Sequence, residues 1–309
     1  MSPLHALKTF STRLKGTTLV YGCALMAFSV FMVQCMNSFS KLASESYDPI
    51  EIVFYRCILA LALLCAWLVA TGRYDLLKTD RPMAHIGRSV VGNISVSLVF
   101  WAYSLMPMAH VTTILLTSGI VVTILSSFIL HEKITPMRWA AVSCGLLGSL
   151  IASNPAGPGF NLVGTGVAFL AMMVTSIVPV LLRSMGKTEN AFTTVFYFFL
   201  AGTCAGGLYV LYKGHMPRLE DMGMLGGTAI AAVGVQIART NAFKLVEASV
   251  LSPLNYTALI WAILLGWLIW DDAPDLAVMI GASLVIASNL GIIWWESKKV
   301  PAQVSDAAP

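Results

Sequence analysis

Three arginines lie within long apolar stretches of the sequence, and they are the residues best able to bind a charged ligand. Arg56 lies well inside one stretch, whereas Arg88 and Arg239 lie near the ends of two others. An arginine near the centre of a membrane helix costs about 2.5–3.5 kcal/mol on insertion scales, so it needs a partner or a wet cavity. Because a guanidinium matches a carboxylate or phosphate with two parallel hydrogen bonds, these residues predict an anionic ligand group. The alternatives are snorkelling to the interface and bonding to helix-end carbonyls.

A second set of candidate residues is mostly uncharged and repeats at helical spacing within four of the apolar stretches. Interhelical hydrogen bonding explains isolated Asn and Gln side chains, whereas several aligned stripes favour a polar cavity. Aromatic side chains in such a cavity would offer ring faces to an amphipathic metabolite. With two of the arginines, the predicted substrate-binding residues are Gln34, Asn37, Arg56, Asn93, Ser97, Trp101, Gln236, Arg239, Asn255 and Tyr256.

The sequence contains no recognisable arrangement for catalysis. It has no phosphate-binding loop, and His131-Glu132 does not continue into a zinc-binding helix. The six cysteines all lie inside apolar stretches, which predicts buried packing residues and neither a disulfide framework nor a zinc site. We therefore expect a protein that is not an enzyme, with no metal, no cofactor and no nucleic-acid partner. Glu51 and Glu247 lie close to interfaces, so the sequence offers no obvious acid for proton coupling.

The composition indicates which elements must position these side chains. Hydrophobic residues make up 57% of the chain and charged residues only 11%, whereas a soluble domain has about 25% charged residues. The apolar residues fall in blocks of about 20, the length that crosses a hydrocarbon core of about 30 Å as an α-helix. The alternating pattern of a membrane barrel is absent. The fold class predicted is therefore an all-α membrane protein.

Ten spans can be placed between the proline- and glycine-rich connections that break the apolar blocks. They are 18–40, 49–70, 83–105, 108–130, 136–153, 161–184, 191–212, 219–245, 248–270 and 274–295. Pro179 predicts a bend in the sixth span. Gly202-x-x-x-Gly206 and Gly223-x-x-x-Gly227 predict close helix packing.

Lysine and arginine predict the orientation of these spans. With a cytoplasmic N-terminus, fourteen of these residues fall on the cytoplasmic side, and only Lys41, Lys213 and Arg218 fall on the other. We therefore predict a multi-pass protein of the cell (inner) membrane with both termini in the cytoplasm.

The two halves of the sequence resemble each other. Val53-Phe54-Tyr55 recurs as Val195-Phe196-Tyr197, 142 residues later, and the same offset relates Lys41 to Arg183. Five spans per half is an odd number, so the second half must enter the membrane from the opposite side. This predicts two inverted five-helix repeats, which is typical of alternating-access carriers. A duplication that records ancestry alone is the alternative. The predicted organisation is a cytoplasmic tail (1–17), the first repeat (18–153), the second repeat (161–295) and a cytoplasmic tail (296–309).

Several short motifs carry a resemblance to a known family. They are Phe54-Tyr55-Arg56, Arg81-Pro82-x-x-His85-x-x-Arg88-x-x-x-Gly92, Ala102-Tyr103-x-Leu105-x-Pro107-x-Ala109 and His131-Glu132. Over about 18–295 the chain resembles the EamA-type members of the drug/metabolite transporter superfamily. His131 departs from the pattern, because the family usually has glycine before the glutamate.

The resemblance implies ten helices of which the first, third, fourth, sixth, eighth and ninth surround a central cavity, and four of these six carry the polar stripes. Family members export amino acids, take up S-adenosylmethionine or riboflavin, or move other metabolites. We therefore expect a secondary transporter for a small amphipathic metabolite, most plausibly an amino acid or a derivative such as S-adenosylmethionine. The alternatives are a carrier of riboflavin or another metabolite, an intramembrane enzyme and a channel. The sequence does not predict the direction of transport or the oligomeric state.

Overall fold

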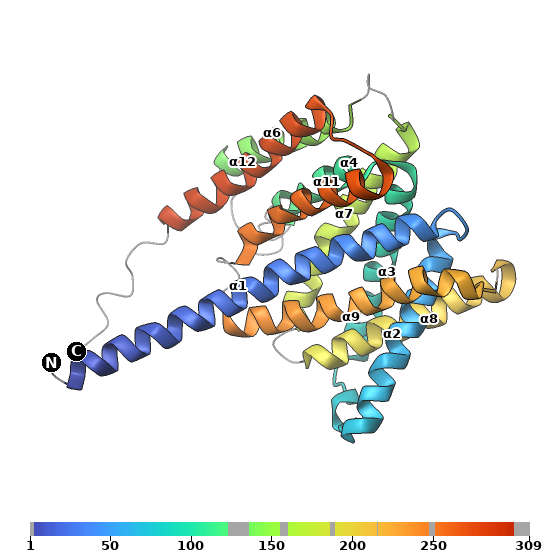
Figure 1. Cartoon of the computed structure of the whole chain (residues 1–309), viewed down its shortest axis with the longest axis horizontal. Helices are drawn as coiled ribbons and strands as arrows, with labels where there is room; N and C mark the ends of the chain where they lie inside the picture. The colour runs from blue at the N-terminus through green and yellow to red at the C-terminus, as the bar shows by residue number, and fades with distance from the viewer. Residues whose placement is uncertain are drawn as a thin grey trace.

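The computed structural model describes residues 3–122, 136–154, 160–185, 189–214, 216–246 and 251–299, and within these ranges it is helical apart from short connections. The ten α-helices are α1 Pro3–Ala43, α2 Pro49–Thr71, α3 Pro82–Leu105, α4 Met108–Leu116, α6 Pro136–Ala152, α7 Leu162–Met185, α8 Ala191–Lys213, α9 Met222–Leu245, α11 Thr257–Trp270 and α12 Leu276–Lys299 (Figure 1). Three 3-10 segments join them: η1 Tyr74–Leu77, η2 Leu219–Asp221 and η3 Ser252–Tyr256.

The all-helical membrane fold predicted from composition is confirmed. Each of the ten predicted spans overlaps one α-helix, and seven helices are long and apolar enough to cross a bilayer by themselves. The three shorter apolar helices comprise Met108–Val122, Trp139–Ala152 and Leu276–Gly291. The predicted turn at His131-Glu132 lies outside the described residues.

Prolines and local hydrogen bonds explain where several helices begin and end. Pro49 and Pro82 occupy the first turns of α2 and α3, where the missing N–H of proline is not needed. The backbone N–H of Asp48 donates to Glu51 Oε2 at 2.9 Å, which satisfies one donor at the start of α2. At the other end of α2, Gly72 has a φ of 66°, a left-handed conformation that terminates a helix at little cost to glycine.

Three boundaries differ from those predicted from hydropathy. Helix α1 begins at Pro3 and not near residue 18, because hydropathy marks the apolar part of a helix and not its continuation into a polar sequence. The fourth span is interrupted at Thr117, whose hydroxyl is hydrogen-bonded to that of Ser149 on α6. The ninth span opens with the 3-10 segment η3, which contains Pro253, and the α-helix starts only at Thr257. Pro179 lies inside α7 as predicted.

The helices pack in a set of pairs that joins the early and late parts of the chain. Helix α1 lies along α9, α3 along α7, α2 along α8, and α6 along α12. The blue α1 lies between the orange helices α9 and α11 (Figure 1). Further pairs are α3 with α8, α2 with α9, α1 with α11, and α4 with both α7 and α11. No half of the chain could keep this arrangement without the other half.

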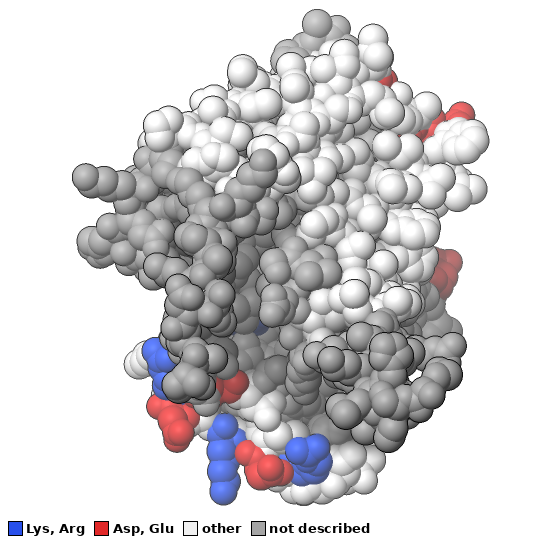
Figure 2. Space-filling model, turned by 90° about the vertical axis from the view of Figure 1, so that its left-hand side faces the viewer, with Lys and Arg blue, Asp and Glu red and all other residues white. Residues whose placement is uncertain are grey.

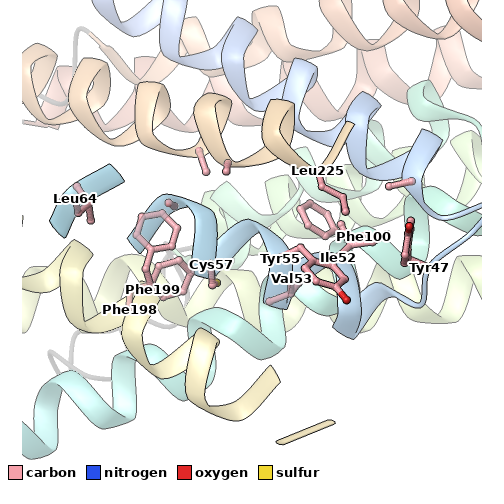
Figure 3. Close-up of a cluster of buried hydrophobic side chains, with 14 residues drawn as sticks. Tyr47, Ile52, Val53, Tyr55, Cys57, Leu64, Phe100, Phe198, Phe199 and Leu225 are labelled. Carbon is pink, nitrogen blue, oxygen red and sulfur yellow. The ribbon is translucent and has the colours of Figure 1, made fainter. Parts of the chain in front are cut away.

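Small residues allow α2, α3, α8 and α9 to approach closely around the largest buried cluster. A side chain at Gly206 would meet Phe54 at 2.8 Å, and one at Gly227 would meet the ring of Phe39 at 2.9 Å. Gly202 is similarly enclosed, whereas Gly223 faces open space, so close packing holds for three of the four predicted glycines. Phe198 and Phe199 of α8 point into this cluster beside Cys57 of α2 (Figure 3).

The outer surface of the bundle is largely apolar, as a lipid-facing surface must be. On α3 the exposed positions Met83, Ile86, Val90 and Ile94 recur at helical spacing. In the view of Figure 2, charged side chains gather along the lower edge, at the level of the α2–α3 connection at the bottom of Figure 1. Lipid can therefore cover the sides of the molecule while its charged connections remain in water.

Helices α6 and α12 touch through backbone atoms at a pair of glycines. A side chain at Gly148 would lie 2.7 Å from the carbonyl oxygen of Gly281, and a side chain at Gly281 would clash with the carbonyl oxygen of Gly148. We predict that Gly281→Leu lowers the unfolding temperature of the purified protein, because overpacking a tight contact costs about 1–3 kcal/mol. Gly291→Leu on the same helix is the control, since nothing lies within 4 Å of that position. Equal effects of the two substitutions would show that the α6–α12 contact contributes little.

Candidate functional site

Gln34 and Asn37 on α1 belong to a buried hydrogen-bond network. Both are 3% exposed, and Asn37 Nδ2 donates to Gln34 Oε1 at 3.4 Å. The hydroxyl of Tyr103 on α3 lies near both amides and 2.9 Å from Thr112 Oγ1 on α4. The predicted polar face of the first span therefore joins three helices, and Asn37 Oδ1 is left without a partner.

Arg56 is held in the interior by groups that neutralise little of its charge. Its side chain is on α2 and is 3% exposed. Its Nη1 donates to Met36 Sδ at 3.6 Å and its Nη2 to Cys57 Sγ at 3.8 Å, and both sulfurs are weak acceptors. The guanidinium carbon lies 5.5–5.7 Å from the ring centroids of three phenylalanines, Phe100, Phe198 and Phe199. Its Nε has no partner.

Arg88 is also buried, although its position near a helix end left snorkelling open. The residue is on α3 and is 5% exposed. Its guanidinium carbon lies 4.3 Å from the centroid of Phe198, the ring that Arg56 also contacts. Its Nε and Nη1 have no hydrogen-bond partner. The structure therefore brings Arg56 together with a second arginine that was not among the predicted binding residues.

The third-span candidates divide between packing and surface positions. Asn93 Nδ2 donates to the carbonyl oxygens of Ser89, at 2.9 Å, and Phe198, at 3.2 Å. Ser97 donates to the carbonyl of Asn93, one turn back. Trp101 is 43% exposed and continues the outward-facing stripe of α3. Asn93 thus ties α3 to α8, and Trp101 lies apart from the two arginines.

The candidates in the second half are partly buried. Gln236 and Arg239 lie one turn apart on α9, and Arg239 Nε has no hydrogen-bond partner. Asn255 and Tyr256 are part of η3, which packs against α1 and leads into α11. The hydrogen bonds and ring contacts described for Arg56 and Arg88 are made with other residues.

One end of the bundle is closed by polar contacts that the sequence did not predict. Lys41 Nζ at the end of α1 lies 3.2 Å from Asp272 Oδ2 and 4.5 Å from the ring centroid of Trp270. Asp275 contacts His110 Nε2 at 3.9 Å and is hydrogen-bonded to Asn154. These contacts join α1, α4 and α6 to the α11–α12 connection.

A tyrosine connects the same end of the bundle to the start of α9. Tyr47 donates to Asp221 Oδ2 at 2.7 Å and accepts the N–H of Arg218 at 3.1 Å. Burial, together with the hydrogen bond to Asp221, raises the pKa of Tyr47 above its usual value. The neutral phenol is therefore the form that stabilises this connection.

The opposite connections, α2–α3 and α7–α8, meet through an ion pair. His85 Nε2 lies 2.9 Å from Glu189 Oε2, and both side chains are at most 3% exposed. The hydroxyls of Thr193 and Tyr197 donate to the carbonyls of Leu76 and Leu77. His85 belongs to one of the motifs noted in the sequence, but nothing in the sequence identified Glu189 as its partner. Within the described ranges no three His, Cys, Asp or Glu side chains cluster as a metal site would require.

The fold and the buried polar interior define a polytopic α-helical membrane protein. The profile of the EamA-like transporter family matches residues 20–154 and, a second time, residues 162–294. The chain belongs to this family, and a general transporter role follows from that membership.

Individual relatives are distant in sequence but similar over most of their length. A riboflavin transporter of Vibrio cholerae is 26% identical over 271 residues, which cover 85% of this chain and 90% of the relative. An S-adenosylmethionine uptake transporter of Rickettsia bellii is 23% identical over 301 residues, with 97% and 99% covered. A protein crystal structure that is 16% identical superimposes with a TM-score of 0.63 over 90% of this chain and 99% of the other, so it shares the fold.

The His85–Glu189 pair predicts a pH dependence of stability. The hydrogen bond from His85 holds the pKa of Glu189 below its usual range, and burial opposes this effect. A carboxyl whose pKa is lowered in the folded state stabilises the protein above its unfolded pKa of about 4.3, and this contribution is lost as the pH falls through the folded value. Glu189→Gln should therefore lower the unfolding temperature at pH 7, and its difference from wild type should shrink towards pH 4.

The control for this experiment is Glu220→Gln, because the Glu220 side chain is 73% exposed. A Glu189→Gln effect that stays constant from pH 7 to pH 4 would contradict an ionised Glu189 at this contact. The measurement is thermal unfolding of the detergent-solubilised protein across that range.

Proposed function

We propose that this protein is a secondary carrier that moves a small amphipathic metabolite across the membrane by alternating access. Its two halves are 18–153 and 161–295, related as inverted five-helix repeats. The substrate site lies between them and includes Gln34, Asn37, Arg56, Asn93, Ser97, Trp101, Gln236, Arg239, Asn255 and Tyr256.

The observation that carries this proposal is the set of packed helix pairs. When each helix is replaced by its counterpart five spans away, α1–α9 becomes α7–α3, α2–α9 becomes α8–α3, and α1–α11 becomes α7–α4. The pairs α2–α8, α4–α11 and α6–α12 exchange with themselves. The most extensive helix pairs thus survive this exchange, whereas smaller contacts such as α1–α3, α2–α3 and α4–α12 do not. Survival of the main pairs is expected of a two-fold relation between halves, which inverted-repeat carriers use to form two alternative states.

Side-chain contacts support the same relation at two places. The reciprocal contact of Gly148 with Gly281 joins counterpart helices. Phe54 and Tyr55 form an edge-on ring pair with centroids 5.1 Å apart, and Phe196 and Tyr197 form one with centroids 5.9 Å apart. The repeated sequence motif thus recurs as a repeated local structure.

Polar contacts between the halves occur at both ends of the bundle, as a carrier with two gates requires. Lys41–Asp272 and His110–Asp275 join the halves at one end, and His85–Glu189 joins them at the other. Contacts of this kind can be broken at one end while those at the other end persist.

The substrate class proposed is an amino acid or an amino-acid derivative such as S-adenosylmethionine. This proposal takes support from the S-adenosylmethionine uptake transporter that the chain resembles over almost its whole length. A riboflavin-like substrate is the alternative, and the riboflavin transporter among the relatives supports it.

Counterflow in proteoliposomes tests the carrier function. A thermal-shift screen against amino acids, nucleosides, S-adenosylmethionine and flavins selects the solute, because a ligand of the native state raises apparent stability. Vesicles loaded with that unlabelled solute should then take up the labelled solute faster than empty vesicles. Gln236→Ala and Asn255→Ala should lower this uptake more than they lower the amount of protein in the membrane. Flux that is unsaturable and shows no trans-acceleration would indicate a channel and overturn the proposal.

The proposed location is the inner membrane with both termini in the cytoplasm, which the asymmetry of Lys and Arg supports. Cysteines introduced as Gly157→Cys and Ala273→Cys should react with an impermeant maleimide added outside intact cells. A cysteine introduced as Arg138→Cys should react only after permeabilisation. Labelling of Arg138→Cys in intact cells would overturn the ten-span orientation, and the wild-type protein provides the background from the native cysteines.

A further inference from the structure

Arg56 and Arg88 form a pair of like charges in the interior of the bundle, and the part of the chain that the structure describes gives this pair no counter-charge. Both guanidinium groups contact the ring of Phe198, so their separation cannot exceed the sum of the two distances to that ring, 5.5 Å and 4.3 Å. Among the described residues, no carboxylate forms an ion pair with Arg56 or Arg88. Two positive charges are therefore buried together.

The groups around the pair cannot compensate for its desolvation. An unpaired ion removed from water loses several kcal/mol, and two like charges at short range repel each other as well. Arg56 is surrounded by two sulfur atoms and three phenyl rings, and Arg88 packs on one of the same rings. Ring faces attract a cation by only about 0.5–2 kcal/mol, which is less than the desolvation penalty.

Three N–H groups of the pair remain available to a ligand. Arg56 Nε, Arg88 Nε and Arg88 Nη1 are buried and have no hydrogen-bond partner. Snorkelling does not apply, because the two side chains are 3% and 5% exposed. Helix-end carbonyls do not accept from these three atoms either. Buried donors without acceptors in a membrane protein mark a functional site.

The pair also lies where the two halves meet. Arg56 and Arg88 belong to α2 and α3 of the first half, and Phe198 belongs to α8 of the second half. Asn93 Nδ2 bonds to the backbone carbonyl of Phe198, which holds that ring against α3. A side chain at Gly92 would meet Phe198 at 3.0 Å, so glycine at this position leaves room for the ring beside Arg88.

We propose that Arg56 and Arg88 together bind the doubly charged end of an anionic substrate, with the surrounding phenyl rings contacting its apolar part. This inference rests on the proposed carrier function and revises its substrate class, because an amino-acid derivative with two carboxylates fits the pair whereas S-adenosylmethionine, which has one carboxylate, does not. A single carboxylate would neutralise only one guanidinium, so the site favours an organic phosphate monoester or a derivative with two carboxylates. Arginine suits both, because its planar fork donates two parallel hydrogen bonds. The substrate-binding set therefore gains Arg88.

Phenyl phosphate and phenyl sulfate are the probes that test the charge requirement, because they have similar shape but carry about two charges and one charge near pH 7.5. Phenyl phosphate should raise the unfolding temperature of the purified full-length protein, and phenyl sulfate should do so much less. Phenylsuccinate, with two carboxylates, and its monoamide, with one, repeat this comparison. Whichever of phenyl phosphate and phenylsuccinate binds more tightly shows whether the site prefers a phosphate or two carboxylates. Equal binding of phosphate and sulfate esters would overturn the proposal.

The variants Arg56→Gln and Arg88→Gln should each weaken phenyl phosphate binding at least about tenfold, since each removes a charged hydrogen bond. The control is Arg218→Gln, because the Arg218 side chain is 74% exposed and contacts the equally exposed Glu220. Arg88→Lys should retain part of the affinity, because it keeps the charge and loses the fork. Unchanged affinity in both Gln variants would overturn the proposal.

The stability of the ligand-free protein distinguishes this role from a structural one. Replacing either arginine by Gln relieves repulsion between two buried charges, so the ligand-free variants should unfold at the same temperature as wild type or higher. If both variants unfold at a markedly lower temperature and the dianions do not stabilise wild type, the arginines are structural and the proposal is wrong.

A lipid headgroup is the other possible source of a phosphate. Phenyl phosphate affinity should be the same in nanodiscs of phosphatidylcholine and in nanodiscs that also contain phosphatidic acid. Loss of affinity in phosphatidic acid would assign the site to a headgroup and overturn the substrate proposal. These binding measurements need no transport, so their failure leaves the carrier function standing, whereas absence of counterflow would overturn the carrier function without affecting the binding result.

Discussion

The hydrocarbon core of a bilayer offers no hydrogen bonds, so each polar group inside this bundle must find its partner within the protein. Most described side chains obey this constraint locally. The hydroxyls of Ser97 and Ser176 donate hydrogen bonds to backbone carbonyls one turn earlier in their own helices. The amide of Asn93 donates to backbone carbonyls on two helices. The same constraint makes Arg56 and Arg88 conspicuous, because among the described residues these two buried charges have no counter-charge, and three of their N–H groups have no hydrogen-bond partner. Their burial is therefore better explained by a ligand than by packing.

Association of helices in lipid depends on close contact, because lipid is as apolar as the helix surfaces and provides no hydrophobic driving force. The glycine contacts of α6 with α12, and of α8 with α2 and α3, supply such contact. The helices joined in this way come from opposite halves of the chain. A carrier built from two such halves gains its main interface from packing, while the polar contacts at its ends remain few enough to rearrange.

The sequence predicted what depends on length and local chemistry, and it missed what depends on packing partners. Apolar blocks of about 20 residues and the prolines between them located all ten helices, because hydropathy and helix starts are local properties. The break at Thr117 was not predicted, and the Ser149 hydroxyl of α6 that is hydrogen-bonded to Thr117 lies far along the chain. The sequence could not decide whether the Arg88 side chain reaches the membrane interface or stays in the interior, because its location depends on where Phe198 of α8 lies. Likewise, His85 stood out in a motif, but Glu189 became its partner only through the fold.

The polar contacts differ in strength along the bundle, and this difference bears on the proposed mechanism. Lys41 and Asp272 are 14% and 33% exposed, so their ion pair contributes only about 0–1 kcal/mol and opens readily. His85 and Glu189 are almost fully buried, so opening that end requires water to enter and solvate both groups. Between them lie two arginines whose charge a bound dianion would neutralise. Such a ligand would bind most tightly to the conformation in which α2, α3 and α8 converge. A ligand shifts a conformational equilibrium only by the difference between its affinities for the two conformations. In the proposed mechanism, binding at the centre of the bundle would supply the free energy for gating, and the more exposed Lys41–Asp272 end would open at the lower cost.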